Sequence, residues 1–102
     1  MSYQRLCSLA ELPSPGTARQ LALGSLPVAV CNVGAQVHAF DGKCPHRGGP
    51  LGQGTLEGTQ LTCPWHAWTF DATTGECVTT PGVWQTKYAV EVEGDSLLVD
   101  VA

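Results

Sequence analysis

Two short stretches of the sequence each bring a cysteine and a histidine close together. In "CPHRGGPLGQG" one residue separates Cys44 from His46, and in "CPWHAW" two residues separate Cys63 from His66. Sixteen residues lie between the two pairs. Thiolate sulfur and imidazole nitrogen are good ligands for transition metals, and two chelating pairs can supply four ligands to one site. The spacing therefore predicts a metal centre held by Cys44, His46, Cys63 and His66.

Two kinds of metal centre compete for this ligand set. Zinc accepts two cysteines and two histidines in a tetrahedral site, but its usual fingers keep the cysteines in one pair and the histidines in the other. A two-iron cluster with one iron on cysteines and the other on histidines takes one ligand of each kind from each loop, because each loop then reaches both irons. The pairing favours an iron–sulfur cluster, with zinc as the alternative.

The residues that flank the ligands favour the same choice. A proline follows each cysteine and stiffens both loops. Gly48 and Gly49 allow backbone N–H groups to approach a bridging sulfide closely. Trp65 and Trp68 could exclude water from a redox centre, although aromatic residues at these positions could equally be ordinary core residues.

The composition limits the remaining classes of protein. A chain of 102 residues is expected to form a single domain, residues 1–102, and its 12 glycines and 7 prolines suggest many short strands. A net charge of -4 without a basic cluster argues against nucleic acid and anionic membrane as partners. No apolar stretch approaches the ~20 residues of a membrane-spanning helix. Because the N-terminus also lacks a signal-peptide layout, a cytoplasmic location is expected.

Strands are expected wherever apolar residues run together or alternate with polar ones. The clearest example is the hairpin at 87–101, in which Gly94 and Asp95 turn the chain. The run 27–33 is apolar on both faces, which predicts a buried strand. The pattern as a whole predicts an all-β chain with two projecting loops, at about 43–50 and 63–68. Further strands are expected at 18–23, 37–40, 59–62 and 69–78, the last interrupted by a turn.

The stretch "CPHRGGPLGQG" followed by "LTCPWHAWTFDATTG" resembles the Rieske [2Fe–2S] family, and the resemblance extends from about Val28 to the C-terminus. It implies a Rieske-type β-sandwich with a small cluster-binding subdomain formed by the two loops. It also implies one [2Fe–2S] cluster per chain. The segment "TTPGV" falls where the family packs a third loop over the cluster. In the implied ligand set, one iron is bound by Cys44 and Cys63 and the other by His46 and His66.

Within that family, the sequence resembles the low-potential members. High-potential members carry an extra cysteine in each loop, joined as a disulfide, and this chain has none at those positions. They also carry hydroxyl side chains where this chain has Trp68 and Phe70. Fewer hydrogen bonds to sulfur leave the reduced cluster less stabilised. We therefore expect a reduction potential near the low end of the Rieske range, roughly -150 mV.

The resemblance points to a carrier rather than an enzyme. After the cluster takes its ligands only His38 remains, too few for a second iron site, and no Gly-rich nucleotide fingerprint is present. The chain is most similar to soluble Rieske-type ferredoxins of ring-hydroxylating dioxygenase systems. Such proteins pass electrons from a flavin-dependent reductase to a terminal oxygenase, with transient docking expected near His46 and His66. The alternatives are the small Rieske-like subunit of assimilatory NAD(P)H nitrite reductase and a zinc-bound or metal-free interaction module.

The remaining notable side chains have plainer expected roles. Cys7, Cys31 and Cys77 have no neighbouring ligand in the sequence and are expected to be small structural hydrophobic residues. Trp84 is expected in the core. His38 is expected to be structural or on the surface.

Overall fold

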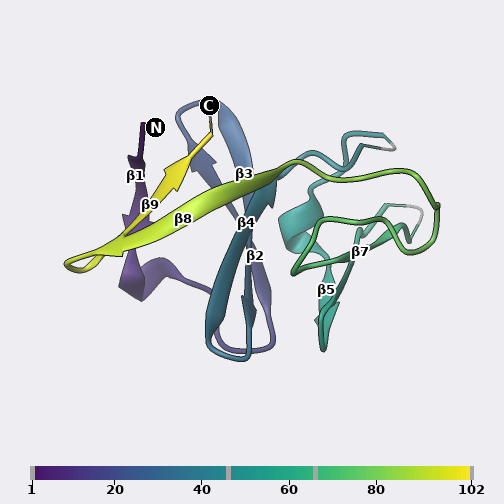
Figure 1. Ribbon diagram of the computed structural model, residues 1–102, viewed down its shortest axis with the longest axis horizontal. Coiled ribbons are helices and arrows are strands. Elements are labelled where there is room, and N and C mark those ends of the chain that lie inside the picture. The colour runs from purple at the N-terminus through teal and green to yellow at the C-terminus, as the bar shows by residue number, and fades with distance from the viewer. Residues whose placement is uncertain (1, 46, 66, 102) are drawn as a thin grey trace.

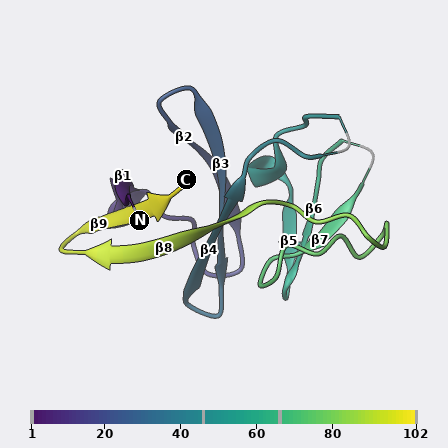
Figure 2. The same ribbon diagram turned by 45° about the horizontal axis from the view of Figure 1, so that its top comes forward.

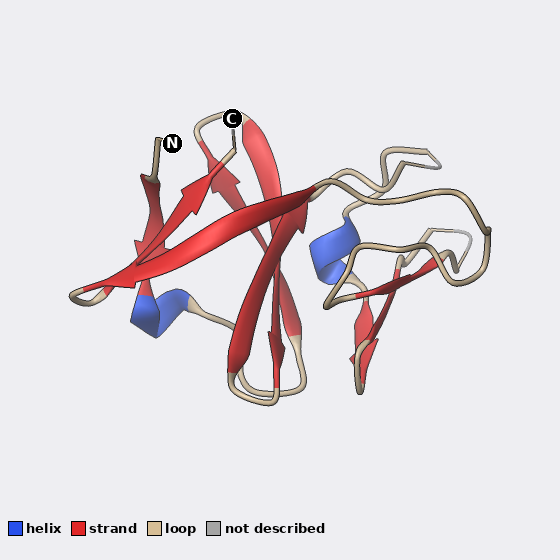
Figure 3. Cartoon of the chain, viewed as in Figure 1, coloured by secondary structure: helices blue, strands red, loops and turns tan. Residues whose placement is uncertain are grey.

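The computed structural model describes residues 2–45, 47–65 and 67–101, which form short strands joined by tight turns (Figures 1 and 3). His46 and His66 lie outside the described residues. Two single 3-10 turns, η1 (Leu9–Glu11) and η2 (Leu51–Gln53), are the helical elements of the described chain. The strands are β1 (Gln4–Ser8), β2 (Ala18–Leu23), β3 (Leu26–Val33), β4 (Gln36–Asp41), β5 (Thr55–Glu57), β6 (Gln60–Thr62), β7 (Thr69–Asp71), β8 (Lys87–Glu93) and β9 (Ser96–Asp100).

The strands form two antiparallel sheets, one of order β1-β9-β8-β4-β3-β2 and one of order β5-β6-β7. In the larger sheet, β4 and β8 pair only at Ala39–Tyr88 and Phe40–Lys87. The sheet divides at this short junction into a β1-β9-β8 half and a β2-β3-β4 half. Figures 1 and 2 show three groups of strands, with β2, β3 and β4 lying between the β8–β9 hairpin and the small sheet. The predicted all-β sandwich with a small subdomain is confirmed.

The central strand β3 is buried on both faces, as its uniformly apolar sequence predicts. Val28 and Val30 pack in a core with residues of β1, β8 and β9, such as Val99. Ala29 and Cys31 point the other way, into a second core shared with the small sheet. Because successive side chains of a strand alternate between faces, one strand supplies both cores. The small subdomain is thereby packed directly onto the sandwich.

Most strands lie where the sequence predicts them, and the hairpin at 87–101 turns at Gly94 with a φ of +62°. Two strands, β1 and β5, were not expected, because their short runs mix polar and apolar residues. The expected second strand within 69–78 is reduced to isolated bridges, Phe70–Cys77 and Glu76–Trp84. Within the part of the chain that the structure describes, no helix has the length and apolar character needed to cross a membrane.

The expectation that Trp84 lies in the core is wrong, because its side chain is 58% exposed. Trp84 forms an isolated antiparallel β-bridge with Glu76, whose side chain is also exposed. The side chains of the adjacent Cys77 and Val83 point inward. The alternation of side chains along this bridge therefore places the indole on the outer surface.

Candidate metal centre

Cys44 and Cys63 belong to the same buried core, between the β2-β3-β4 layer and the small sheet. Their exposed fractions are 2% and 1%. Cys44 follows β4 in the loop that the Lys43–Pro50 bridge closes, and Cys63 directly follows β6. The structure thus brings two of the four predicted ligands into one cluster of side chains, whereas the predicted histidine ligands lie outside the described residues.

The two cysteine loops share the same backbone frame. The amide of Cys44 donates to the carbonyl of Gly49 at 2.9 Å, and the amide of Cys63 donates to the carbonyl of Trp68 at 2.7 Å. In each case the acceptor is the fifth residue after the cysteine. Each loop is therefore closed on itself at its base by a hydrogen bond from the cysteine backbone.

The same residue position turns the backbone in both loops. The fourth residue after each cysteine has a positive φ, +74° at Gly48 and +57° at Ala67. Glycine adopts this left-handed conformation at little cost, whereas an L-residue with a Cβ pays about 1–2 kcal/mol. Ala67 consequently holds a conformation that disfavours its own side chain, and the loop's hydrogen bonds must stabilise it there.

An indole joins one loop to the other. A Cβ added at Gly49 would lie 2.9 Å from the ring of Trp65, so the ring packs directly on the first loop's backbone. Trp65 is nevertheless 50% exposed, while the half-buried Trp68 packs against the core that holds both cysteines. The expected exclusion of water from this core is thus supported at Trp68, and Trp65 instead has an open face.

A third segment, residues 76–86, is bound to the end of the second loop. The amide of Val78 donates to the carbonyl of Thr69 at 2.8 Å, and the amide of Thr69 donates to the hydroxyl of Thr79 at 3.2 Å. In Figures 1 and 2 this segment, coloured green, runs along the outer side of the small sheet. The third loop expected near Pro81 is therefore packed beside β7.

The same segment is bound to the start of the first loop through Gln85. Its side-chain amide donates to the carbonyls of Lys43 at 2.6 Å and Asp41 at 2.8 Å. Its backbone amide donates to the carbonyl of Gly75 at 2.7 Å. Gln85 is 6% exposed. Among the described residues it is the one polar side chain that is buried. Sequence reasoning missed it, because a single glutamine in "WQTK" carries no pattern.

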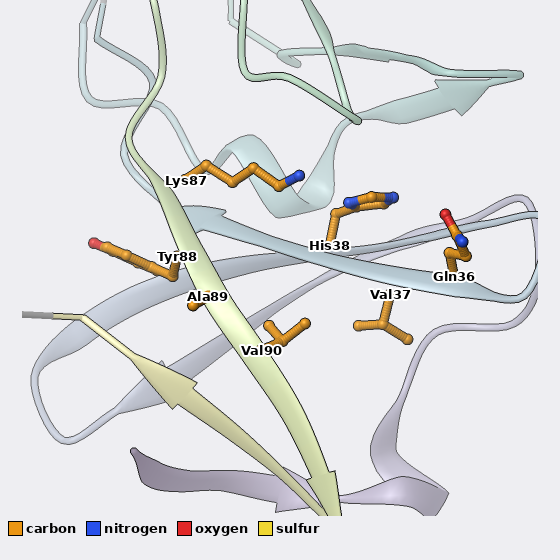
Figure 4. Close-up of a pocket in the computed structure, with 7 residues that line it drawn as sticks. All are labelled: Gln36, Val37, His38, Lys87, Tyr88, Ala89 and Val90. Atoms are coloured by element: carbon orange, nitrogen blue, oxygen red, sulfur yellow. The ribbon is translucent and has the colours of Figure 1, made fainter. Parts of the chain in front are cut away.

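A pocket of about 440 Å³ opens where β4 and β8 separate beyond their two paired positions. Figure 4 shows His38 and Lys87 on one side of the strands and Val37 and Val90 on the other. None of the described residues of the cysteine loops lines this pocket. Its lining residues are Gln36, Val37, His38, Lys87, Tyr88, Ala89 and Val90.

His38 sits in this pocket with a buried Nε2 atom that has no hydrogen-bond partner among the described residues. Burial lowers the pKa of its imidazole, and the nearby Lys87 ammonium lowers it further, against a smaller opposite effect of Asp71. The imidazole is therefore neutral at pH 7. This environment fits the structural or surface role expected for His38.

The three cysteines outside the loops are buried thiols, as expected of structural residues. Burial raises the pKa of Cys31 to about 12. The pKa of Cys7 is also raised, mainly by burial and to a smaller extent by the nearby Glu11 carboxylate. Cys77 lies in the same core as the two loop cysteines, with its sulfur 3.4 Å from the Thr79 hydroxyl.

The donor set of the loops fits an iron–sulfur group, since it offers buried sulfur ligands in a mostly apolar core. A family model described as the Rieske [2Fe–2S] domain matches residues 2–93. The chain belongs to the Rieske [2Fe–2S] family, and this domain implies a [2Fe–2S] cluster.

Two curated relatives differ greatly in length. The ferredoxin component of biphenyl 2,3-dioxygenase from Rhodococcus jostii is 32% identical over 102 residues, which cover 99% of this chain and 94% of that protein. Human apoptosis-inducing factor 3 is 33% identical over 95 residues, which cover 92% of this chain. The matched residues span only 16% of that longer protein.

Solved structures share the fold. A chain from the complex of reduced oxygenase and oxidized ferredoxin in carbazole 1,9a-dioxygenase is 32% identical, with a TM-score of 0.81 over 95% of this chain and 91% of that chain. A protein named as the small subunit of an NADPH nitrite reductase has a TM-score of 0.80 over 99% of this chain and 100% of that one. Its identity is 17%, so this likeness concerns the fold alone.

Proposed function

We propose that the protein is a one-electron carrier, a Rieske-type ferredoxin that passes electrons from a flavin-dependent reductase to a terminal ring-hydroxylating oxygenase. The observation that carries this proposal is the end-to-end match to a dioxygenase ferredoxin component, over 99% of this chain and 94% of that protein. Carrying an electron requires a cluster site and docking surfaces, without a substrate pocket beside the cluster. On this proposal the protein is not itself an enzyme.

The proposed ligands are Cys44 and Cys63 on one iron and His46 and His66 on the other. When bound, a [2Fe–2S] cluster supplies reversible one-electron chemistry. The buried positions of the two cysteines and the matching hydrogen bonds at their loop bases support this assignment. These loops would hold the sulfur ligands rigidly, and Trp68 would keep water from one side of them.

Partners would dock transiently near His46 and His66, because in the proposed ligand set these residues would lie between the cluster and a partner and so conduct the electron. A ferredoxin from a carbazole 1,9a-dioxygenase system, which resembles this chain, is recorded in complex with its oxygenase. We further propose a cytoplasmic location. The buried, unbridged thiols of Cys7, Cys31 and Cys77 fit a reducing compartment.

Electron paramagnetic resonance of dithionite-reduced protein tests the centre. A rhombic signal with an average g below two is expected for a two-iron cluster with histidine ligands. The Cys63→Ser variant should lose the signal, whereas Cys31→Ser, a matched change of a buried cysteine outside the loops, should keep it. Colourless wild-type protein that contains zinc and gives no signal would refute the carrier.

A second experiment tests the direction of electron flow. Reduced protein is mixed with an oxidised oxygenase component, and the bleached visible absorption should recover as the electron leaves. Protein that holds the cluster but exchanges electrons with neither a reductase nor an oxygenase would overturn the proposed function while leaving the family assignment intact.

A further inference from the structure

We propose that the outer face of the third loop, formed by Val78 and Trp84, is a contact surface for the oxygenase component. This inference rests on the proposed function and extends it from the loop tips to a separate segment of the chain. The partner expected there is an apolar recess of the oxygenase surface that can take an indole ring.

Exposed apolar side chains are concentrated on one part of the molecule. Among the described residues the large hydrophobic side chains that are exposed are Trp65 (50%), Val78 (44%), Trp84 (58%) and Val92 (57%). Three of them lie on the cysteine loops or on the segment bound to those loops, and only Val92 lies on the distant β8–β9 hairpin. Exposed apolar residues gathered in one region indicate an interaction site, and tryptophan is enriched among residues that dominate binding energy.

The strand-like geometry of the third loop turns Val78 and Trp84 to the same side. Cys77 donates its backbone amide to the carbonyl of Val83 at 2.8 Å. The Cys77 side chain belongs to the buried core, and the Val83 side chain packs against that core. Because side chains alternate, Val78 and Trp84 project outward together with Glu76, the bridge partner of Trp84. Both outward apolar residues are exposed even though the fold buries their neighbours.

This outer face is held in place at both ends. At one end Val78 is bound to Thr69, next to the second cysteine loop. At the other, Gln85, the residue after Trp84, is bound to Lys43, next to the first loop. A rigid surface loses little conformational entropy on binding, which favours affinity. Because Thr69 and Lys43 adjoin the two cysteine loops in the chain, a partner docked near those loops would lie close to this surface.

The oxygenase is preferred to the reductase as the partner because a similar ferredoxin is recorded with its oxygenase. The chemistry agrees, because the outward face carries two apolar side chains and a single charged one, that of Glu76. Such a surface fits an apolar recess better than a charged one.

The affinity of the cluster-loaded protein for the oxygenase component of carbazole 1,9a-dioxygenase tests the proposal. Trp84→Ala should raise the Kd at least about tenfold, in the range of an interface hot spot. Val78→Ala should raise it about threefold, as expected for a smaller contact. Val92→Ala is the matched control for Val78→Ala, since it removes the same atoms from another exposed valine, 57% exposed against 44% for Val78, outside the loops. It should leave the Kd unchanged.

The visible spectrum, the paramagnetic signal and the rate of oxidation by ferricyanide should be unchanged in Trp84→Ala, since the indole acts on docking. An unchanged Kd for Trp84→Ala would overturn the contact surface, as would a larger loss of affinity for the reductase than for the oxygenase. Altered spectra would overturn it too, by showing that Trp84 acts on the cluster. If the wild-type protein neither binds the oxygenase nor passes it an electron, the proposed function would be overturned as well. If only the prediction for Trp84→Ala fails, the proposed role as an electron carrier would stand.

Discussion

Gln85 donates its side-chain amide to the carbonyl of Lys43 at 2.6 Å, across 42 residues of sequence. Lys43 immediately precedes Cys44, and Gln85 immediately follows the exposed Trp84. One buried side chain therefore links the base of the first cysteine loop to the end of the third loop. This link makes the position of the first loop depend on residues near the C-terminus.

Replacing Gln85 with leucine should loosen the first loop. The substitution keeps the buried volume but removes the hydrogen bonds to Lys43 and Asp41, so the free energy of unfolding should fall by about 1–2 kcal/mol. The visible absorption of the cluster should also bleach faster in air. Gln60→Leu, on the exposed surface of β6, is the control and should behave as wild type. Equal bleaching rates for the two variants would contradict the proposed role of Gln85.

Glycine at position 67 should stabilise the second loop. Ala67 holds a φ of +57°, where its Cβ costs about 1–2 kcal/mol, and part of the gain from removing it is offset by the greater freedom of glycine in the unfolded chain. Ala67→Gly should therefore raise the free energy of unfolding by up to about 1 kcal/mol, measured by urea denaturation.

The control for this prediction is Ala22→Gly on the exposed side of β2. There the backbone is extended, so glycine should destabilise the protein by about 0.5–1 kcal/mol. If both variants lost stability equally, the left-handed turn at Ala67 would not be costly.

His38 should make the protein less stable below about pH 6.5. Burial and Lys87 lower the pKa of the folded-state imidazole below its ordinary value of 6.5. In the interval between these two pKa values the unfolded chain binds more protons than the folded protein. Stability is therefore complete above pH 6.5 and falls as the pH drops toward the folded-state pKa.

The measurement is the urea midpoint of wild type and His38→Gln between pH 7.5 and pH 5.5. The charged groups near the imidazole, Lys87 and Asp71, are present in both proteins, so the difference isolates His38. The wild-type midpoint should fall more steeply with acid than that of the variant. Parallel curves would show that His38 is not desolvated.

The reduction potential should lie near the low end of the Rieske range, roughly -150 mV. Trp68 and Phe70 stand where high-potential members carry hydroxyl groups, and neither side chain can donate an O–H hydrogen bond to sulfur. Protein-film voltammetry gives the midpoint directly. A value well above zero would show that other donors stabilise the reduced state.

The sequence by itself determined the features that depend on local spacing. Cys44 stands in a loop rich in glycine and proline, Cys63 stands in a loop where Pro64 follows it, and β3 is buried because it is apolar on both faces. The hairpin at 87–101 follows from alternation and a glycine turn. Such features could be predicted because the residues that cause them are neighbours in the chain.

Only the tertiary structure decided the features that depend on distant pairing. Gln4 pairs with Val99 across almost the whole chain, so the mixed run that forms β1 is a strand only because β9 offers an edge. Trp84 is exposed because its bridge to Glu76 fixes which side faces the core, and Gln85 is buried because Lys43 lies beside it. No local pattern encodes these contacts, since each is formed by segments that meet only after the chain has folded.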